Sequence, residues 1–122
     1  MKIFVAHSRN FDFQNELYEP LRQSELNKTH TLFFPHEGSA ETKTKDIIKN
    51  SDIVIAETSY PATGMGIELG WADAFDIPIY AFYKEGSVPS RSAQFVTRKS
   101  TQYKDLQELV ALIEKVITNH GA

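Results

Sequence analysis

The sequence has no cysteine, which excludes a disulfide framework, a thiol nucleophile and a cysteine metal site. No apolar run approaches the roughly 20 residues that a membrane-spanning helix needs, and Lys2 leads into a predicted strand without the pattern of a signal peptide. The basic residues form no block and the net charge is −3, so nucleic acids and anionic membranes are unexpected partners. We therefore expect a cytoplasmic protein that binds neither nucleic acid nor membranes.

Glycine and proline are also sparse, at six and five among 122 residues, and the sequence has no linker, internal repeat or low-complexity tract. A chain of this length can bury a real core but is short for two domains. We expect residues 1–122 to form one domain, with one site in each protomer.

What the sequence does contain is an alternation of apolar, strand-like runs and amphipathic, helix-like runs. The predicted strands cover residues 2–6, 31–34, 53–56, 77–83 and 95–98. The predicted helices cover residues 12–26, with Pro20 as a kink or an interruption, 42–50, 64 or 65 to 76, and 105 to about 121, where Asp105 and Glu108 form a capping-box-like pair. This alternation implies an α/β fold with a doubly wound, parallel, five-stranded sheet of flavodoxin-like strand order 2-1-3-4-5.

The most informative stretch covers residues 51–72 and reads SDIVIAETSYPATGMGIELGWA. Its first part is a strand buried on both faces, which ends at Glu57 before a loop rich in proline, glycine and hydroxyl residues. The helical spacing that follows places Glu68 in a first helical turn, where the helix dipole favours an ionised carboxylate and unpaired N–H groups can hold a phosphate. The alternative is that Glu68 only stabilises its own helix. Because ligands of open α/β sheets bind beyond the carboxyl ends of the strands, the loop is a predicted site.

Two other predicted strand ends carry polar residues. After the first strand, Arg9 can pair with a phosphate to which His7 or Ser8 donates a hydrogen bond; alternatively, the same residues form a polar turn before the next helix. After the second strand, His36 has the titration range for acid–base catalysis, and the alternative is a structural hydrogen-bonding role.

The central stretch also contains a spaced motif that resembles a known family. Its fixed positions are Ala56-Glu57, Pro61, Gly64, Gly66, Glu68, Leu69 and Gly70. The motif resembles the nucleoside 2-deoxyribosyltransferase superfamily, and particularly its branch of 2'-deoxynucleoside 5'-monophosphate N-glycosidases. Weaker matches at residues 2–9, at His36 and at Ser92-Ala93 extend the resemblance over about residues 2–117.

The resemblance implies a reaction and a set of site residues. The Glu68 carboxylate would attack the anomeric carbon of a deoxyribose, the base would leave, and water or another base would resolve the covalent glycosyl-enzyme. His36 or Glu57 would assist, no cofactor or metal is expected, and Ser92 would reach the neighbouring subunit's site in a homodimer or higher homo-oligomer. The residues that would hold the nucleoside or nucleotide are His7, Ser8, Arg9, Ser59, Gly64, Met65 and Gly66.

One position departs from the family pattern. The family usually has an Asp eight residues before the residue matching Asp52, and this sequence has Thr44 there. In the relatives that Asp helps to orient or protonate the leaving base, so Asp46, Glu57 or His36 would have to substitute for it. Two other functions therefore stay open: a catalytically inactive nucleotide-binding or signalling module of the same fold, and a flavodoxin-like domain that binds a flavin or a partner protein.

Overall fold

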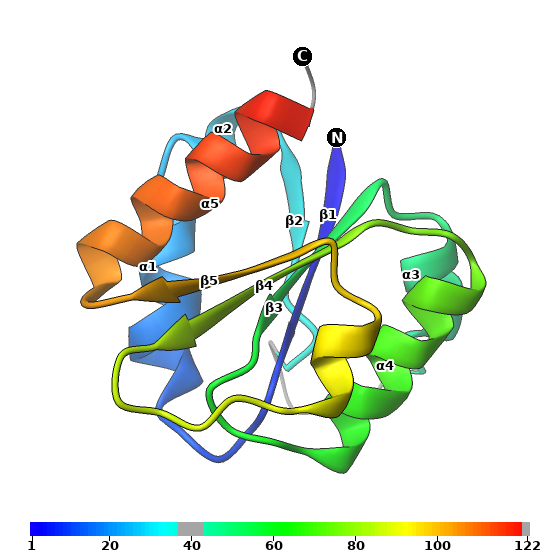
Figure 1. Ribbon diagram of the computed structural model, residues 1–122. Helices are drawn as coiled ribbons and strands as arrows, with labels where there is room; N and C mark the ends of the chain where they lie inside the picture. The colour runs from blue at the N-terminus through cyan, green and yellow to red at the C-terminus, as the bar shows by residue number, and fades with distance from the viewer. Residues whose placement is uncertain (37–42, 121–122) are drawn as a thin grey trace.

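The computed structural model describes residues 1–36 and 43–120. Five parallel strands form one sheet with the order β2-β1-β3-β4-β5, so the predicted fold class and strand order are confirmed (Figure 1). The strands are β1 (Lys2–His7), β2 (Thr31–Phe33), β3 (Ile53–Glu57), β4 (Ile79–Lys84) and β5 (Lys99–Tyr103). Because all strands run in the same direction, their carboxyl ends meet at one edge of the sheet, where ligands of such folds bind.

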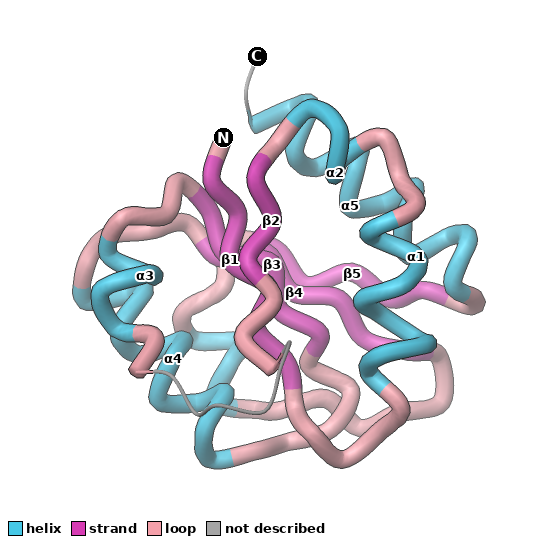
Figure 2. The backbone as a smooth tube through the Cα atoms, turned by 180° about the vertical axis from the view of Figure 1, so that it is seen from behind, coloured by secondary structure: helices cyan, strands magenta, loops and turns pink. Residues whose placement is uncertain are grey.

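Helices cover both faces of this sheet. On one side lie α1 (Glu19–Arg22), α2 (Leu26–Thr29) and α5 (Leu106–His120), and on the other lie α3 (Lys45–Lys49) and α4 (Thr63–Ala74), as the two opposite views show (Figure 1 and Figure 2). A π-helix, η1 (Gln14–Tyr18), runs directly into α1, and a 3₁₀ helix, η2 (Ser92–Phe95), precedes β5. No helix within the described ranges is both long and apolar enough to cross a membrane.

Each face of the sheet has its own apolar core, because successive strand residues point to opposite faces. The core toward α1 and α5 contains Ile3, Val5, Leu17, Leu21, Ile53, Ile55, Phe82, Tyr103, Leu109, Ile113 and Ile117. The core toward α3 and α4 contains Phe4, Ala6, Ile48, Val54, Ala56, Met65, Leu69, Ala72 and Ile79. β1 and β3 contribute to both cores, which explains why their sequences are continuously apolar.

The helix predicted over residues 12–26, with a kink or an interruption at Pro20, is interrupted, but after Arg22 rather than at Pro20. η1 and α1 run end to end, and Pro20 lies in the first turn of α1, where a missing N–H is tolerated. α1 then ends at Arg22 and α2 is a separate turn. The apolar spacing behind the prediction is correct, because Leu17 and Leu21 are buried.

The last predicted strand is misplaced. Residues 95–98 form no strand, and Phe95 instead ends η2 with 90% of its surface exposed. β5 follows at Lys99–Tyr103, an edge strand in which only Tyr103 is buried. An edge strand with one buried side chain has little apolar pattern, so hydrophobicity pointed to the wrong segment.

α4 begins earlier than predicted, which changes the position of Glu68. Ala62 is the N-cap, with an extended backbone (φ −153°, ψ 142°), and the helix starts at Thr63. Glu68 is therefore the sixth helical residue, and the predicted first-turn position is wrong. Because the dipole effect falls off within the first turn, it does little to favour the ionised form of Glu68.

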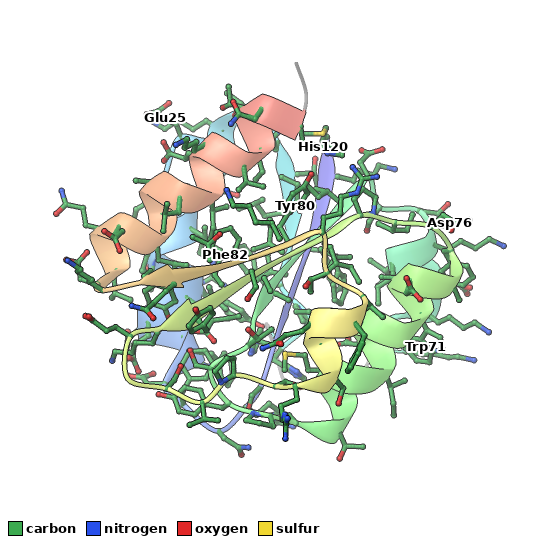
Figure 3. All side chains as sticks on the ribbon, in the orientation of Figure 1. Glu25, Trp71, Asp76, Tyr80, Phe82 and His120 are labelled. Carbon is green, nitrogen blue, oxygen red and sulfur yellow. The ribbon has the colours of Figure 1, made fainter. Side chains whose placement is uncertain are left out.

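The far end of α4 closes in a Schellman motif around Asp76, which has a left-handed backbone (φ 58°) (Figure 3). The Asp76 N–H donates to the Asp73 carbonyl (3.0 Å) and the Ile77 N–H to the Ala72 carbonyl (2.9 Å). Since the helix end uses the N–H of Ile77, β4 starts at Ile79 rather than at residue 77.

The remaining helix boundaries are close to those predicted. The start predicted for the third helix, residue 42, lies outside the described residues, and α3 is observed over Lys45–Lys49. The capping pair before α5 is confirmed: the Glu108 N–H donates to Asp105 Oδ1 (2.8 Å), and Glu108 Oε1 accepts from the Lys104 N–H (2.9 Å). The end predicted for α5, near residue 121, is likewise outside the described part of the chain.

Candidate active site

A cavity of about 380 Å³ opens beside α4 at the carboxyl edge of the sheet. Strand ends supply His7, Arg9 and His36, the approach to α3 supplies Lys43 and Thr44, and α4 with its N-cap supplies Ala62, Gly64, Met65, Ile67, Glu68 and Trp71. Segments far apart in the sequence thus meet around one carboxylate. The volume lies within the range of about 300–1,000 Å³ that small-molecule sites occupy.

Glu68 is half-buried in the wall of this cavity. The hydroxyl of Thr44 donates a hydrogen bond to its Oε2 (2.6 Å), and no basic side chain in the described ranges lies within ion-pair distance of it. Burial raises the pKa of Glu68 above its ordinary value, and the Thr44 hydrogen bond opposes that rise. The hydroxyl of Thr44 therefore does what the helix dipole was expected to do, which is to favour the ionised form.

His7 lines the cavity but is held by structural hydrogen bonds. Its Nδ1 lies 2.7 Å from the Ser8 carbonyl oxygen, which can only accept, so this nitrogen carries the proton. Its Nε2 lies 2.5 Å from the hydroxyl of Tyr18 and accepts from it. Burial is the main reason that the pKa of His7 falls to about 4, and the imidazole is neutral at physiological pH.

His36 is the more accessible imidazole of the cavity. Its backbone N–H donates to the Tyr18 hydroxyl (3.0 Å), and its ring stacks edge-on against that of His7 at 5.1 Å between centroids. Burial, with a smaller contribution from the charge of Arg9, lowers the pKa of His36. The bond to Tyr18 fixes the backbone at this position and leaves the ring nitrogens for acid–base work.

Arg9 and Lys43 add positive charge to the same cavity, and both are exposed. Cationic side chains beside a half-buried carboxylate favour a ligand that carries its own negative charge. This matches the prediction of a phosphate partner for Arg9, which stays a prediction.

Glu57 lies elsewhere. It is buried, and its oxygens accept hydrogen bonds from the Ser59 N–H (2.6 Å), the Ser59 hydroxyl (2.9 Å) and the Tyr103 hydroxyl. Burial raises the pKa of Glu57, and these bonds oppose the rise. It does not line the Glu68 cavity, so the catalytic assistance predicted for Glu57 stays a prediction without support from this geometry.

The substrate-binding residues predicted from the sequence fall into separate groups. His7, Arg9, Gly64 and Met65 line the Glu68 cavity. Ser8 and Ser59 do not: the hydroxyl of Ser8 accepts from the Asn10 N–H (2.9 Å), as in the alternative of a polar turn, and Ser59 bonds Glu57.

Gly66 and Ser92 belong to a different hollow. They line a second cavity of about 530 Å³ on the other flank of α4, together with Met65, Leu69, Gly70 and residues in and beside η2. Within this chain they do not reach Glu68, although Ser92 was expected to act on a neighbouring subunit rather than on its own.

Sequence reasoning missed Lys43, Ile67 and Trp71 as cavity residues, and assigned no role to Thr44 beyond its departure from the family pattern. Trp71 follows Glu68 by three positions, so helical spacing already placed the two on one face of the helix. Of the three residues considered as substitutes for the missing Asp, only His36 lines the Glu68 cavity, whereas Asp46 lines a separate hollow between β2 and α3.

Among the described residues no group of three or more His, Cys, Asp or Glu side chains is arranged to hold a metal ion.

Comparisons with known proteins show what the chain as a whole is similar to. A protein of Syntrophotalea carbinolica named "Putative 2'-deoxynucleoside 5'-phosphate N-hydrolase 1" is 34% identical over 86 residues, which cover 66% of this chain and 61% of that relative. The chain is similar in sequence to this protein and spans about three fifths of that relative's length. No family model matches the sequence.

Solved structures with a similar fold match nearly the whole chain. The CMP N-glycosidase BcmB of Clostridium botulinum has a TM-score of 0.70 at 20% identity, over 95% of this chain and 99% of its own. A 2-deoxyribosyltransferase of Bacillus psychrosaccharolyticus has a TM-score of 0.64 at 20% identity, over 90% of each chain. A conserved protein of Enterococcus faecalis V583 has the same TM-score at 19% identity, over 94% of this chain and 98% of its own. At these identities the structural likeness establishes the fold, and the reaction has to be argued from the site.

Proposed function

We propose that the protein cleaves or transfers the N-glycosidic bond of a nucleoside or nucleoside 5'-monophosphate, with Glu68 as the nucleophile. The observation that carries the proposal is a half-buried carboxylate in the wall of a small-molecule cavity, held by a hydroxyl donor and without a competing ion pair in the described residues. The names of the similar proteins, an N-hydrolase of deoxynucleoside 5'-phosphates, a CMP N-glycosidase and a 2-deoxyribosyltransferase, share this bond as their target.

The proposed first step is a displacement at the anomeric carbon. A Glu68 oxygen forms a bond to this carbon as the C–N bond breaks, and the bonding electron pair leaves with the base. The conjugate acid of His36 gives its proton to the departing base. A glycosyl ester of Glu68 and neutral His36 remain.

The second step resolves the ester. Neutral His36 accepts a proton from a water molecule as the water oxygen bonds to the anomeric carbon, and the carboxylate of Glu68 leaves. Attack by the nitrogen of another base, in place of water, gives transfer. Arg9 and Lys43 supply the positive charge that a 5'-phosphate would bind.

The pH dependence follows from the two catalytic groups. Activity rises with pH as Glu68, whose pKa is raised by burial, becomes ionised, and falls as His36, whose pKa is lowered by burial, loses its proton. We expect a bell-shaped profile of kcat/KM with its maximum below the ordinary His pKa of 6.5.

The test is to incubate the protein with a panel of nucleosides and nucleoside monophosphates, of both sugar types, and to measure free base by chromatography. We expect release with at least one of them, and a loss of more than about 1,000-fold in Glu68→Gln. Glu85→Gln is the matched control, because Glu85 is exposed and far from the cavity lining. Equal melting temperatures would separate lost chemistry from lost folding.

A catalytically inactive nucleotide-binding module is the second candidate, and Thr44 at the position of the family's Asp favours it. Binding of nucleoside monophosphates by calorimetry without release of base from any of them would support the module. Release that depends on Glu68 excludes it.

The homodimer predicted from the resemblance is also a proposal. Ser92 lies in the 530 Å³ hollow beside Gly66 and Gly70, whose lack of side chains allows another chain to approach α4 closely. A mass of two chains by light scattering, reduced to one chain by Gly70→Arg, is the expected result. The cytoplasmic location stays a prediction.

A further inference from the structure

Thr44 occupies an N-cap position but does not cap its helix. It immediately precedes α3, with backbone angles φ −91° and ψ −4°, and its side chain makes no hydrogen bond to the N–H groups of that helix. Threonine at such a position usually bonds the N–H of the second or third helical residue. Here the hydroxyl is directed to a different helix, where it donates to Glu68 Oε2 at 2.6 Å.

The contact is enclosed and specific. Thr44 is only 6% exposed, so water has little access to compete for its hydroxyl. An ionised carboxylate can only accept hydrogen bonds, and a donor at this short distance fixes one of its oxygens and favours the charged form. Among the described residues Oε1 of Glu68 accepts no hydrogen bond, so it is the oxygen left to react.

We propose that Thr44 is a positioning residue, whose hydroxyl holds Glu68 by Oε2 and presents Oε1 to the anomeric carbon. The inference rests on the proposed function. A carboxylate at this position, which the resemblance implies for the family, would share a proton with Glu68 and compete with it for ionisation. Because a threonine hydroxyl yields no proton at neutral pH, protonation of the leaving base falls to His36.

The other charged or titratable side chains that line this cavity come from elements other than α4. His7 and Arg9 follow β1, His36 follows β2, and Lys43 adjoins Thr44. The Thr44 hydroxyl is the hydrogen-bond donor to Glu68 among the described residues, and it acts against desolvation. Removing it therefore changes the titration of Glu68 without removing a charge.

The test compares Thr44→Val with Thr44→Ser. Valine matches the shape of threonine and lacks the hydroxyl, whereas serine keeps the hydroxyl. In Thr44→Val we expect the acidic limb of the kcat/KM profile to move up by roughly one pH unit and kcat to fall about tenfold with little change in KM. In Thr44→Ser we expect kcat to stay within about twofold of wild type and the acidic limb of the profile to stay near its wild-type position.

A second measurement does not depend on activity. The carboxyl carbon of Glu68, assigned by its loss in Glu68→Gln, is titrated by ¹³C NMR in all three proteins. We expect the midpoint to rise in Thr44→Val and to stay near wild type in Thr44→Ser.

The outcomes separate the two proposals. An unchanged Glu68 midpoint in Thr44→Val overturns the positioning role, whether or not the wild type releases base. A raised midpoint with an unchanged pH profile also overturns it. If base release requires Glu68 but is unchanged in the Thr44 variants, the proposed function holds and this inference is wrong. If the wild-type protein releases no base, both proposals are wrong.

Discussion

The buried cluster around Glu57 gives a prediction whose size can be worked out from the structure. Glu57 Oε2 accepts from the hydroxyl of Tyr103 on β5, and the Ser59 hydroxyl, which also donates to Glu57, accepts from the Lys84 N–H at 2.7 Å. The cluster thus connects the carboxyl ends of β3, β4 and β5. Tyr103→Phe removes a single oxygen atom and leaves Glu57 with one donor fewer.

The expected cost is that of a hydrogen bond to a charged, buried group, about 1.5–3 kcal/mol. With an unfolding entropy of about 2.1 cal/mol/K per residue, a loss of about 2 kcal/mol lowers the melting temperature of a 122-residue domain by about 8 °C. Tyr103 is only 3% exposed, so water does not replace the lost donor.

The loss of stability in Tyr103→Phe also depends on pH, and the coupling between proton binding and folding gives its direction. Burial holds the pKa of Glu57 above its unfolded value, and the Tyr103 hydroxyl opposes that rise, so the variant has a still higher folded pKa. When a carboxyl has a higher pKa in the folded protein than in the unfolded chain, the free energy of unfolding falls as the pH rises from the lower pKa through the higher one. The variant, with the higher folded pKa, loses more of this free energy. The difference in free energy of unfolding between wild type and Tyr103→Phe should therefore grow with pH. It should be about 1 kcal/mol while Glu57 is protonated and about 2 kcal/mol once Glu57 is ionised.

Urea denaturation at a series of pH values, followed by the fluorescence of the single tryptophan, Trp71, measures this difference. Tyr80→Phe is the matched control, because the Tyr80 hydroxyl bonds His120 Nδ1 (3.1 Å) at the partly buried end of α5 (Figure 3) and should cost less than about 1 kcal/mol. A loss in Tyr103→Phe below about 0.5 kcal/mol, or one that is the same at every pH, would refute the reasoning. The rate of base release by Tyr103→Phe should stay within about threefold of wild type. Loss of base release in a folded Tyr103→Phe would show that Glu57 assists the reaction.

Two further predictions concern the backbone of α4. Gly64→Ala adds a methyl group at the wall of the Glu68 cavity, where it meets no atom within 4 Å, so we expect an unchanged melting temperature and a KM raised about tenfold in substrate titrations. Glu85→Ala is the control, since Glu85 is exposed and lines neither cavity, and an equal rise in KM there would contradict the assignment of the cavity. Asp76→Gly relieves a left-handed backbone in a residue with a Cβ and should raise the free energy of unfolding by about 0.5–1 kcal/mol, whereas an unchanged urea midpoint would be inconsistent with strain at this position.

The fold was largely predictable because the sequences of its central strands have a clear hydrophobic pattern. β1 and β3 are buried on both faces, and their continuous apolar runs require helices above and below a parallel sheet. The motif between β3 and α4 added the resemblance to a family. β5 was not predictable in the same way, because its sequence KSTQY buries one side chain at the edge of the sheet.

The site was predictable residue by residue only in part. His36 and Arg9 were found because each follows a strand end, and Glu68 because it belongs to the motif between β3 and α4. The contact between Thr44 and Glu68 joins positions 24 apart and depends on the packing of α3 against α4, which no local pattern encodes. The hydrogen bond between Glu57 and Tyr103 was missed for a related reason: with the fifth strand misplaced, the position of Tyr103 beside Glu57 could not be foreseen.

The central claim, that Glu68 forms a covalent bond to the sugar, is tested most directly by intact-protein mass spectrometry after rapid acid quenching of the protein with a nucleoside monophosphate that it cleaves. The account predicts a mass increase equal to the sugar phosphate, located by peptide mapping on Glu68 and absent in Glu68→Gln. Release of base with no adduct at any quench time, or an adduct on another residue, would contradict it.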